Sequence, residues 1–172
     1  MKIESPAYTG EVMIANLNEM QAHDRQVLAD RLERASRRLA EIAPRVRSGR
    51  SDGGEWTQVE VLAHIATMSK FYGVLVHRMV TGQVADLNLL QAAQMRDGAI
   101  DQFSDQEPAE LLRMTLADHE RTIKELRTAD PAALRRAFTL PEGGTMTAEE
   151  VARLPLIAHL EIHVDQLEKS LG

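Results

Sequence analysis

The sequence predicts an all-α protein, a four-helix bundle with short extra helices in its connections. Apolar residues recur three and four positions apart over long stretches, which is the period of an amphipathic helix. Strand-like alternation of apolar and polar residues is rare. Three segments begin with serine or threonine followed three residues later by glutamate, which is typical of a helix N-terminus. Four long amphipathic segments with mostly short connections favour a bundle.

The first long helix is expected over residues 16–43. Pro44 and the polar stretch 48–54 end it, because proline and glycine interrupt helices. One apolar stripe runs along it, formed by Leu28, Leu32, Ala35, Leu39 and Ile42.

The second helix is expected to begin at Thr57 and to run to about Thr81. Thr57 and Glu60 form a capping box, in which the hydroxyl and the carboxylate bond the amides of the first turn. Gly82 is a plausible stop.

The connection over residues 83–103 contains a predicted shorter helix at 89–97. Ser104 and Glu107 form a second capping box and begin a third long helix, which ends near Thr128.

The last part of the chain predicts one more long helix. Asp130, followed by proline, opens a short helical piece, and residues 141–144 form a turn. Thr147 and Glu150 make a third capping box, and the helix they begin runs to about Leu171.

The bulk composition is that of a soluble globular protein. The chain has 172 residues, 44% of them hydrophobic and 27% charged. We expect a single domain spanning residues 1–172. A net charge of −6 argues against a nucleic-acid-binding surface. Because no signal segment and no run of about 18 apolar residues is found, we expect a cytoplasmic protein that does not cross a membrane.

The chain contains no cysteine, which excludes disulfides, thiolate metal sites and a cysteine nucleophile. Any transition metal must therefore be bound by histidine, aspartate or glutamate. No glycine-rich phosphate loop and no serine in a nucleophile elbow is present.

His64 lies in an apolar stripe of the second predicted helix. That face must point into the bundle, and a buried imidazole needs partners for its nitrogens. Two interpretations stay open at this point: a core histidine bonded to a carbonyl or an acid, and a metal ligand. The stripe consists of Val61, His64, Met68, Phe71, Leu75 and Met79.

His159 and His163 lie one turn apart at the edge of the apolar stripe of the last helix. Residues i and i+4 share a helix face, so the pair can bind one metal ion, or both are partly exposed surface histidines. If the last helix neighbours the second, His64 can supply a third ligand. Three neutral nitrogens leave positions open for water or substrate, as a catalytic metal site requires.

The other histidines have simpler expectations. For His119, in an apolar stripe of the third long helix, we favour a core histidine over a substrate contact or a partner of a ligand. His77 and His23 are predicted to lie at the surface. A ligating imidazole usually donates its second N–H to a carboxylate or carbonyl, and the sequence does not choose among the nearby acids. These acids are Glu60, Asp118, Glu161 and Asp165.

Four apolar or aromatic residues lie near the predicted site in sequence. Met68, Phe71 and Tyr72 either line a substrate pocket or pack in the core, and core packing is favoured. Trp56, at a helix start, is expected to pack against a neighbouring helix rather than against a ligand.

Two segments resemble the DinB/YfiT-like superfamily of metal-dependent enzymes. The segment EWTQVEVLAHIATMSKFYGVLVHRMV is similar to the family's tryptophan-initiated helix with an inward histidine. The segment LPLIAHLEIHVDQLEKSLG is similar to its closing HxxxH helix. The resemblance implies a four-helix bundle that binds a divalent metal, such as Zn, Ni or Fe, through His64, His159 and His163.

The resemblance also implies a range of activities. The family includes transferases and isomerases that use low-molecular-weight thiols such as mycothiol, bacillithiol or glutathione, acting on small electrophiles, and members known only as stress-induced proteins. Homodimers are common in it. We expect this chain to lack the additional domain of mycothiol-dependent maleylpyruvate isomerases, which argues against that specific reaction. A metal-dependent hydrolase and a non-catalytic metal-binding or interaction bundle are the alternatives.

Overall fold

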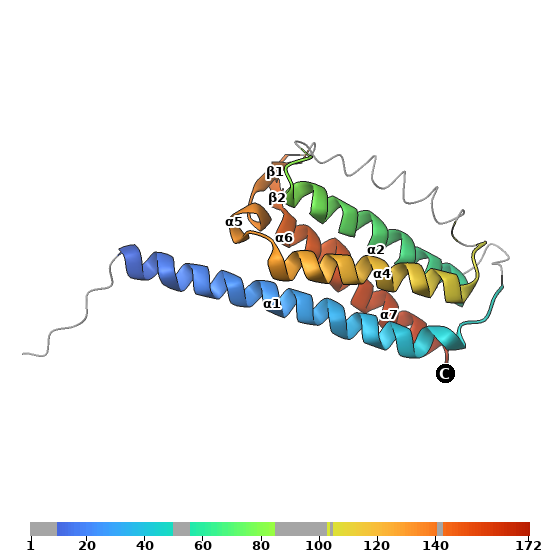
Figure 1. Ribbon diagram of the computed structural model, residues 1–172. Helices are drawn as coiled ribbons and strands as arrows, with labels where there is room; N and C mark the ends of the chain where they lie inside the picture. The colour runs from blue at the N-terminus through green and yellow to red at the C-terminus, as the bar shows by residue number, and fades with distance from the viewer. Residues whose placement is uncertain (1–9, 50–55, 85–102, 104, 141–142) are drawn as a thin grey trace, which may run out of the picture.

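The computed structural model is a helical bundle, as predicted (Figure 1). It describes residues 10–49, 56–84, 103, 105–140 and 143–172, with side chains from residue 17 onward. The predicted short helix at 89–97 lies outside the described residues. The bundle consists of α1 (Gly10–Ile42), α2 (Gln58–Val80), α4 (Pro108–Thr128) and a C-terminal helical segment made of α6 (Ala148–Val151), η2 (Ala152–Ala158) and α7 (His159–Ser170).

The long helices do not simply alternate in direction. α2 and α4 run parallel to each other, while α1 and α7 run in the opposite direction (Figure 1). α4 packs against both α1 and α2, and α2 packs against α7 and η2. The second and last long helices are therefore neighbours, which is the condition for joining His64 to the later histidine pair.

The predicted stripes of the first and last helices lie in the core, whereas Phe71 and Leu75 of the predicted second-helix stripe are half-buried. All five residues of the α1 stripe are buried, and so are Leu156, Leu160, Val164 and Leu167 of the C-terminal segment. α2 is long and apolar enough to cross a membrane by composition alone. However, 61% of its most apolar window is buried inside the bundle, where it serves as a core helix.

Two predicted capping boxes are confirmed, at the starts of α2 and α6. The Thr57 amide donates to Glu60 Oε2 over 2.7 Å while the Glu60 amide donates to Thr57 Oγ1, and Thr147 repeats the pattern with Glu150. The end of α2 is also as predicted. Gly82, with φ of 73°, takes the left-handed conformation that ends a helix, a position that suits glycine.

The predicted start of α4 is wrong. The helix begins at Pro108, and Glu107 is its N-cap rather than its third residue, while Ser104, the predicted cap, lies outside the described residues. Proline suits the first helical position because its missing N–H would have no partner there. Proline, rather than a capping box, therefore marks this boundary.

A small hairpin between α4 and α6 is not predicted by the sequence pattern. The strands β1 (Ala137–Thr139) and β2 (Thr145–Thr147) pair antiparallel, with Phe138 opposite Met146. They follow α5 (Pro131–Leu134), the expected short helical piece. Three residues per strand are too few for alternation to be recognised.

The last helix is not a uniform α-helix. Residues 152–158, which include Pro155, form the π-helix η2. Proline lacks an N–H and its ring clashes with the carbonyl four residues earlier, which the wider turn relieves. The His159 amide consequently bonds the carbonyl of Leu154, five residues back. This wider turn immediately precedes the histidine pair.

Candidate metal centre

The structure brings His64, His159 and His163 together between α2 and α7. One ring nitrogen from each lies within 4.8 Å of the other two. His64 Nε2 is 3.4 Å from His159 Nε2, and His163 Nε2 is 2.8 Å from the same atom. The ring planes of these pairs are nearly perpendicular, at 88° and 78°. Three lone pairs can therefore converge on one point.

These distances suit a metal ion. With metal–nitrogen bonds of 2.0–2.1 Å, a tetrahedral ion separates its ligand nitrogens by about 3.3 Å. The separation of the His64 and His159 nitrogens is close to this value, and the shorter one needs a small outward rotation of the His163 ring. Among the described residues, only these three form a group with metal-ligand geometry.

Gln166 fixes the orientation of one predicted ligand. His163 Nδ1 donates to Gln166 Oε1 over 2.8 Å, which leaves the Nε2 lone pair of His163 available. The partners named from the sequence were all acids, so Gln166 was not among them. Its place one turn after His163, on the same helix face, is the signal that could have found it.

The acids considered for this role are engaged elsewhere. Glu60 bonds the start of α2, and Asp118 bonds Arg121. Two others hold α7 against α1: Glu161 pairs with Arg31 at 2.6 Å and Asp165 with Arg38 at 2.8 Å. These ion pairs fix the position of the helix that carries His159 and His163.

Trp56 lies beside the site. Its ring centroid is 4.8 Å from that of His64 and 6.3 Å from that of His163, although 46% of the residue is exposed. His64 belongs to the helix that Trp56 directly precedes, whereas His163 belongs to α7, so Trp56 packs against a neighbouring helix, as expected; both histidines are candidate ligands. The indole therefore forms an aromatic, solvent-facing wall of the site.

A small cavity of about 10 Å³ adjoins His159 and His163. This volume is close to the minimum that holds one water molecule. Met68 lines the cavity, as one interpretation proposed, but Phe71 and Tyr72 do not; their rings contact each other, 5.0 Å apart. The lining residues are Ile65, Met68, Ser69, Leu156, His159, Leu160 and His163.

His119 is a core histidine, as favoured. Only 1% of it is exposed, and both ring nitrogens are bonded: Nδ1 lies 2.6 Å from Ser36 Oγ and Nε2 lies 2.8 Å from Ser69 Oγ. Burial lowers the pKa of His119 to about 4, because the charged imidazolium would lose its hydration. The ring is therefore neutral at physiological pH. His77 and His23 lie at the surface, as expected.

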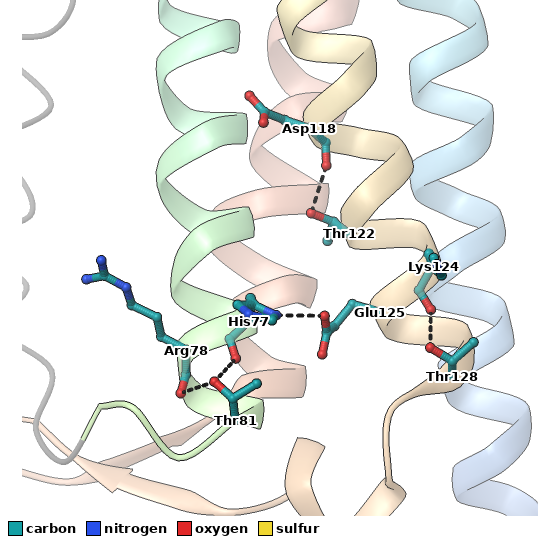
Figure 2. A network of polar contacts seen from close by, with 8 residues as sticks. All are labelled: His77, Arg78, Thr81, Asp118, Thr122, Lys124, Glu125 and Thr128. Atoms are coloured by element: carbon teal, nitrogen blue, oxygen red, sulfur yellow. Dashed lines mark hydrogen bonds and ion pairs between the residues drawn. The ribbon is translucent and has the colours of Figure 1, made fainter.

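A larger groove of about 440 Å³ lies between α2 and α4. Figure 2 shows some of its polar lining residues, among them His77, Asp118 and Glu125. Its lining shares no residue with the cavity beside the three histidines. His77 Nδ1 bonds Glu125 across the groove at 2.9 Å, and Asp118 pairs with Arg121. Burial raises the pKa of Asp118. The polar groups of the groove are thus largely paired with one another, and none of them belongs to the three-histidine group.

Comparison with known families identifies the chain. It matches the DinB superfamily over residues 14–167. This protein belongs to the DinB superfamily. No curated protein matches the chain.

Solved structures share the fold. The mycothiol-dependent maleylpyruvate isomerase matches with a TM-score of 0.62 and 22% identity over 85% of this chain, and a mutant of it matches with 0.64 and 21%. This chain spans 60% of the isomerase. YfiT from Bacillus subtilis, described as a probable metal-dependent hydrolase with an unusual four-helix bundle topology, matches with a TM-score of 0.52 and 17% identity. That match covers 99% of this chain and 94% of YfiT.

Proposed function

We propose that this protein is a divalent-metal-dependent enzyme that uses a low-molecular-weight thiol to modify or isomerise a small electrophile. The observation that carries the proposal is the convergence of one nitrogen each from His64, His159 and His163. Three imidazole nitrogens suit a Zn, Ni or Fe ion and leave coordination positions open.

A metal ion bound there supplies a Lewis acid that favours the thiolate form of a coordinated thiol. The thiol must come from a small molecule, because the chain has no cysteine. Within the DinB superfamily, the name of the isomerase supports mycothiol as one thiol of the right class.

The chain's own residues would hold and shield the site. Gln166 orients His163, and buried His64 supplies a ligand from the core of α2. Met68 and Leu156 give the cavity apolar walls, while the exposed Trp56 ring lies against His64. The burial of most of the apolar window of α2 inside the bundle supports a cytoplasmic location.

The metal centre is tested by the metal content of the purified protein. We expect about one divalent ion per chain in the wild type and its loss in His64→Ala and His159→Ala. His77→Ala is the matched control, because His77 is a surface histidine on the same helix as His64. Full retention of metal in both ligand variants would refute the assignment.

The reaction class is tested by the thiol requirement. Metal-loaded protein should consume a small electrophile only when a thiol such as mycothiol or glutathione is present. A hydrolase is the second candidate, supported by the description of YfiT. Cleavage of an activated ester without thiol would favour it, whereas metal binding with neither activity would favour a non-catalytic bundle.

A further inference from the structure

A chain of buried hydrogen bonds runs from α1 through α4 to the cavity beside the three histidines. Ser36 of α1 bonds His119 Nδ1, and His119 Nε2 bonds Ser69 of α2. Ser69 is 2% exposed and is the one non-histidine polar residue among the residues that line the cavity. His119 itself does not line it. The series of hydrogen bonds thus ends at a cavity that is also lined by two of the candidate ligands, His159 and His163.

The neutral imidazole allows this series of hydrogen bonds to run in either direction, depending on its tautomer. If Nε2 carries the proton, it donates to Ser69 Oγ, and the Ser69 O–H is free to donate into the cavity. If Nδ1 carries the proton, Ser69 donates to Nε2, and its oxygen can accept from the cavity instead. In each case the Ser36 hydroxyl takes the complementary role, as donor or acceptor, at His119 Nδ1. The lowered pKa of His119 keeps the ring uncharged, so both arrangements remain available.

We propose that Ser69 is the hydrogen-bonding contact for a water or hydroxide ligand in this cavity, and that His119 and Ser36 position its hydroxyl. This proposal rests on the proposed metal centre. The remaining cavity residues are apolar or are the candidate ligands His159 and His163. Among the lining residues, Ser69 alone can therefore donate a hydrogen bond to a deprotonated ligand or accept one from a protonated ligand. His119 acts through Ser69 and is a positioning residue.

A structural role alone would have a different signature. A histidine bonded on both sides stabilises the junction of three helices whether or not a ligand is present. A contact to an exchangeable ligand also changes the proton affinity of that ligand. Hydrogen bonds to charged groups are stronger than those between neutral groups, so Ser69 should favour the deprotonated ligand.

The test uses Co²⁺ bound to the full chain and the pH dependence of its visible absorption spectrum. We expect a spectral transition in the wild type whose midpoint rises by about half to one pH unit in Ser69→Ala. Ser36→Ala should raise it by less, because Ser69 is retained and only its orientation is loosened. Thr67→Val is the matched control: Thr67 is a buried α2 hydroxyl bonded to the Ala63 carbonyl and does not line the cavity.

The outcomes separate this proposal from the metal centre on which it rests. Failure of the wild type to bind Co²⁺ would count against the metal centre. Co²⁺ binding with no spectral transition, or with the same midpoint in Ser69→Ala and the wild type, would overturn the role of Ser69. An unchanged midpoint in Ser36→Ala alone would overturn the positioning role of Ser36 and His119. Far-ultraviolet circular dichroism of each variant verifies that it is folded.

Discussion

The buried imidazole of His119 couples the stability of the fold to pH. Its folded-state pKa is about 4, below the ordinary value of 6.5, so the unfolded chain binds the proton more readily. Stability from this residue is therefore complete above pH 6.5 and is lost as the pH falls from there towards 4. The shift corresponds to about 3 kcal/mol.

This coupling predicts the behaviour of a variant. Metal-free wild type should lose free energy of unfolding between pH 7 and pH 4 more steeply than His119→Gln, whose amide does not titrate. Urea unfolding at pH 7, 5.5 and 4 measures both slopes. His23→Gln, at an exposed position on α1, is the control and should keep the wild-type slope. Equal slopes in the wild type and His119→Gln would contradict the argument.

At the same scale, residue type and spacing predicted the three candidate ligands but not their supports. The i, i+4 spacing brings His159 and His163 together because it acts within one helix. Gln166 has only the weak signal of its i, i+3 spacing from His163, since glutamine occupies helix surfaces for many reasons. The role of Ser69 depends on His119, which faces it from another helix, and only the fold determines that.

Among the elements, α2 and α4 make a close crossing at Gly73. A Cβ at this position would lie 2.7 Å from Thr122 Oγ1, which is too close (Figure 2 shows Thr122). Gly73→Ala should destabilise the protein by about 1–2 kcal/mol, because overpacking outweighs the higher helix propensity of alanine. Chemical denaturation measures the change. Adding Thr122→Ala should recover part of the loss, whereas additive effects of the two substitutions would contradict the crossing geometry.

The predictability of the elements follows from how local their causes are. The capping boxes at Thr57 and Thr147 are complete within four residues, and both are correct. The boundary of α4 went wrong because Pro108 offered a competing local signal. The hairpin and the π-helix η2 depend on packing and on a proline inside a helical pattern, and periodicity does not reveal either of them.

For the whole molecule, the arrangement of helices is what assembles the site. Sequence patterns predict four helices but not that α4 runs parallel to α2, nor that α7 packs beside α2. Because His64 comes from α2 and the other two histidines from α7, a bound metal ion would link two core helices that are far apart in sequence. Metal binding and global stability should then be coupled.

Thermal unfolding with and without Zn²⁺ tests this coupling. A ligand that binds only the folded state at 100 times its dissociation constant adds about 2.7 kcal/mol, which is a rise in Tm of about 5–10 °C for a chain of this size. His163→Ala should lose most of that rise, since it removes one ligand at a half-buried position. His77→Ala should retain it, because the exposed His77 belongs to the α2–α4 groove. An equal Zn²⁺-dependent rise in all three proteins would mean that the ion binds elsewhere and that the helices are not joined through these histidines.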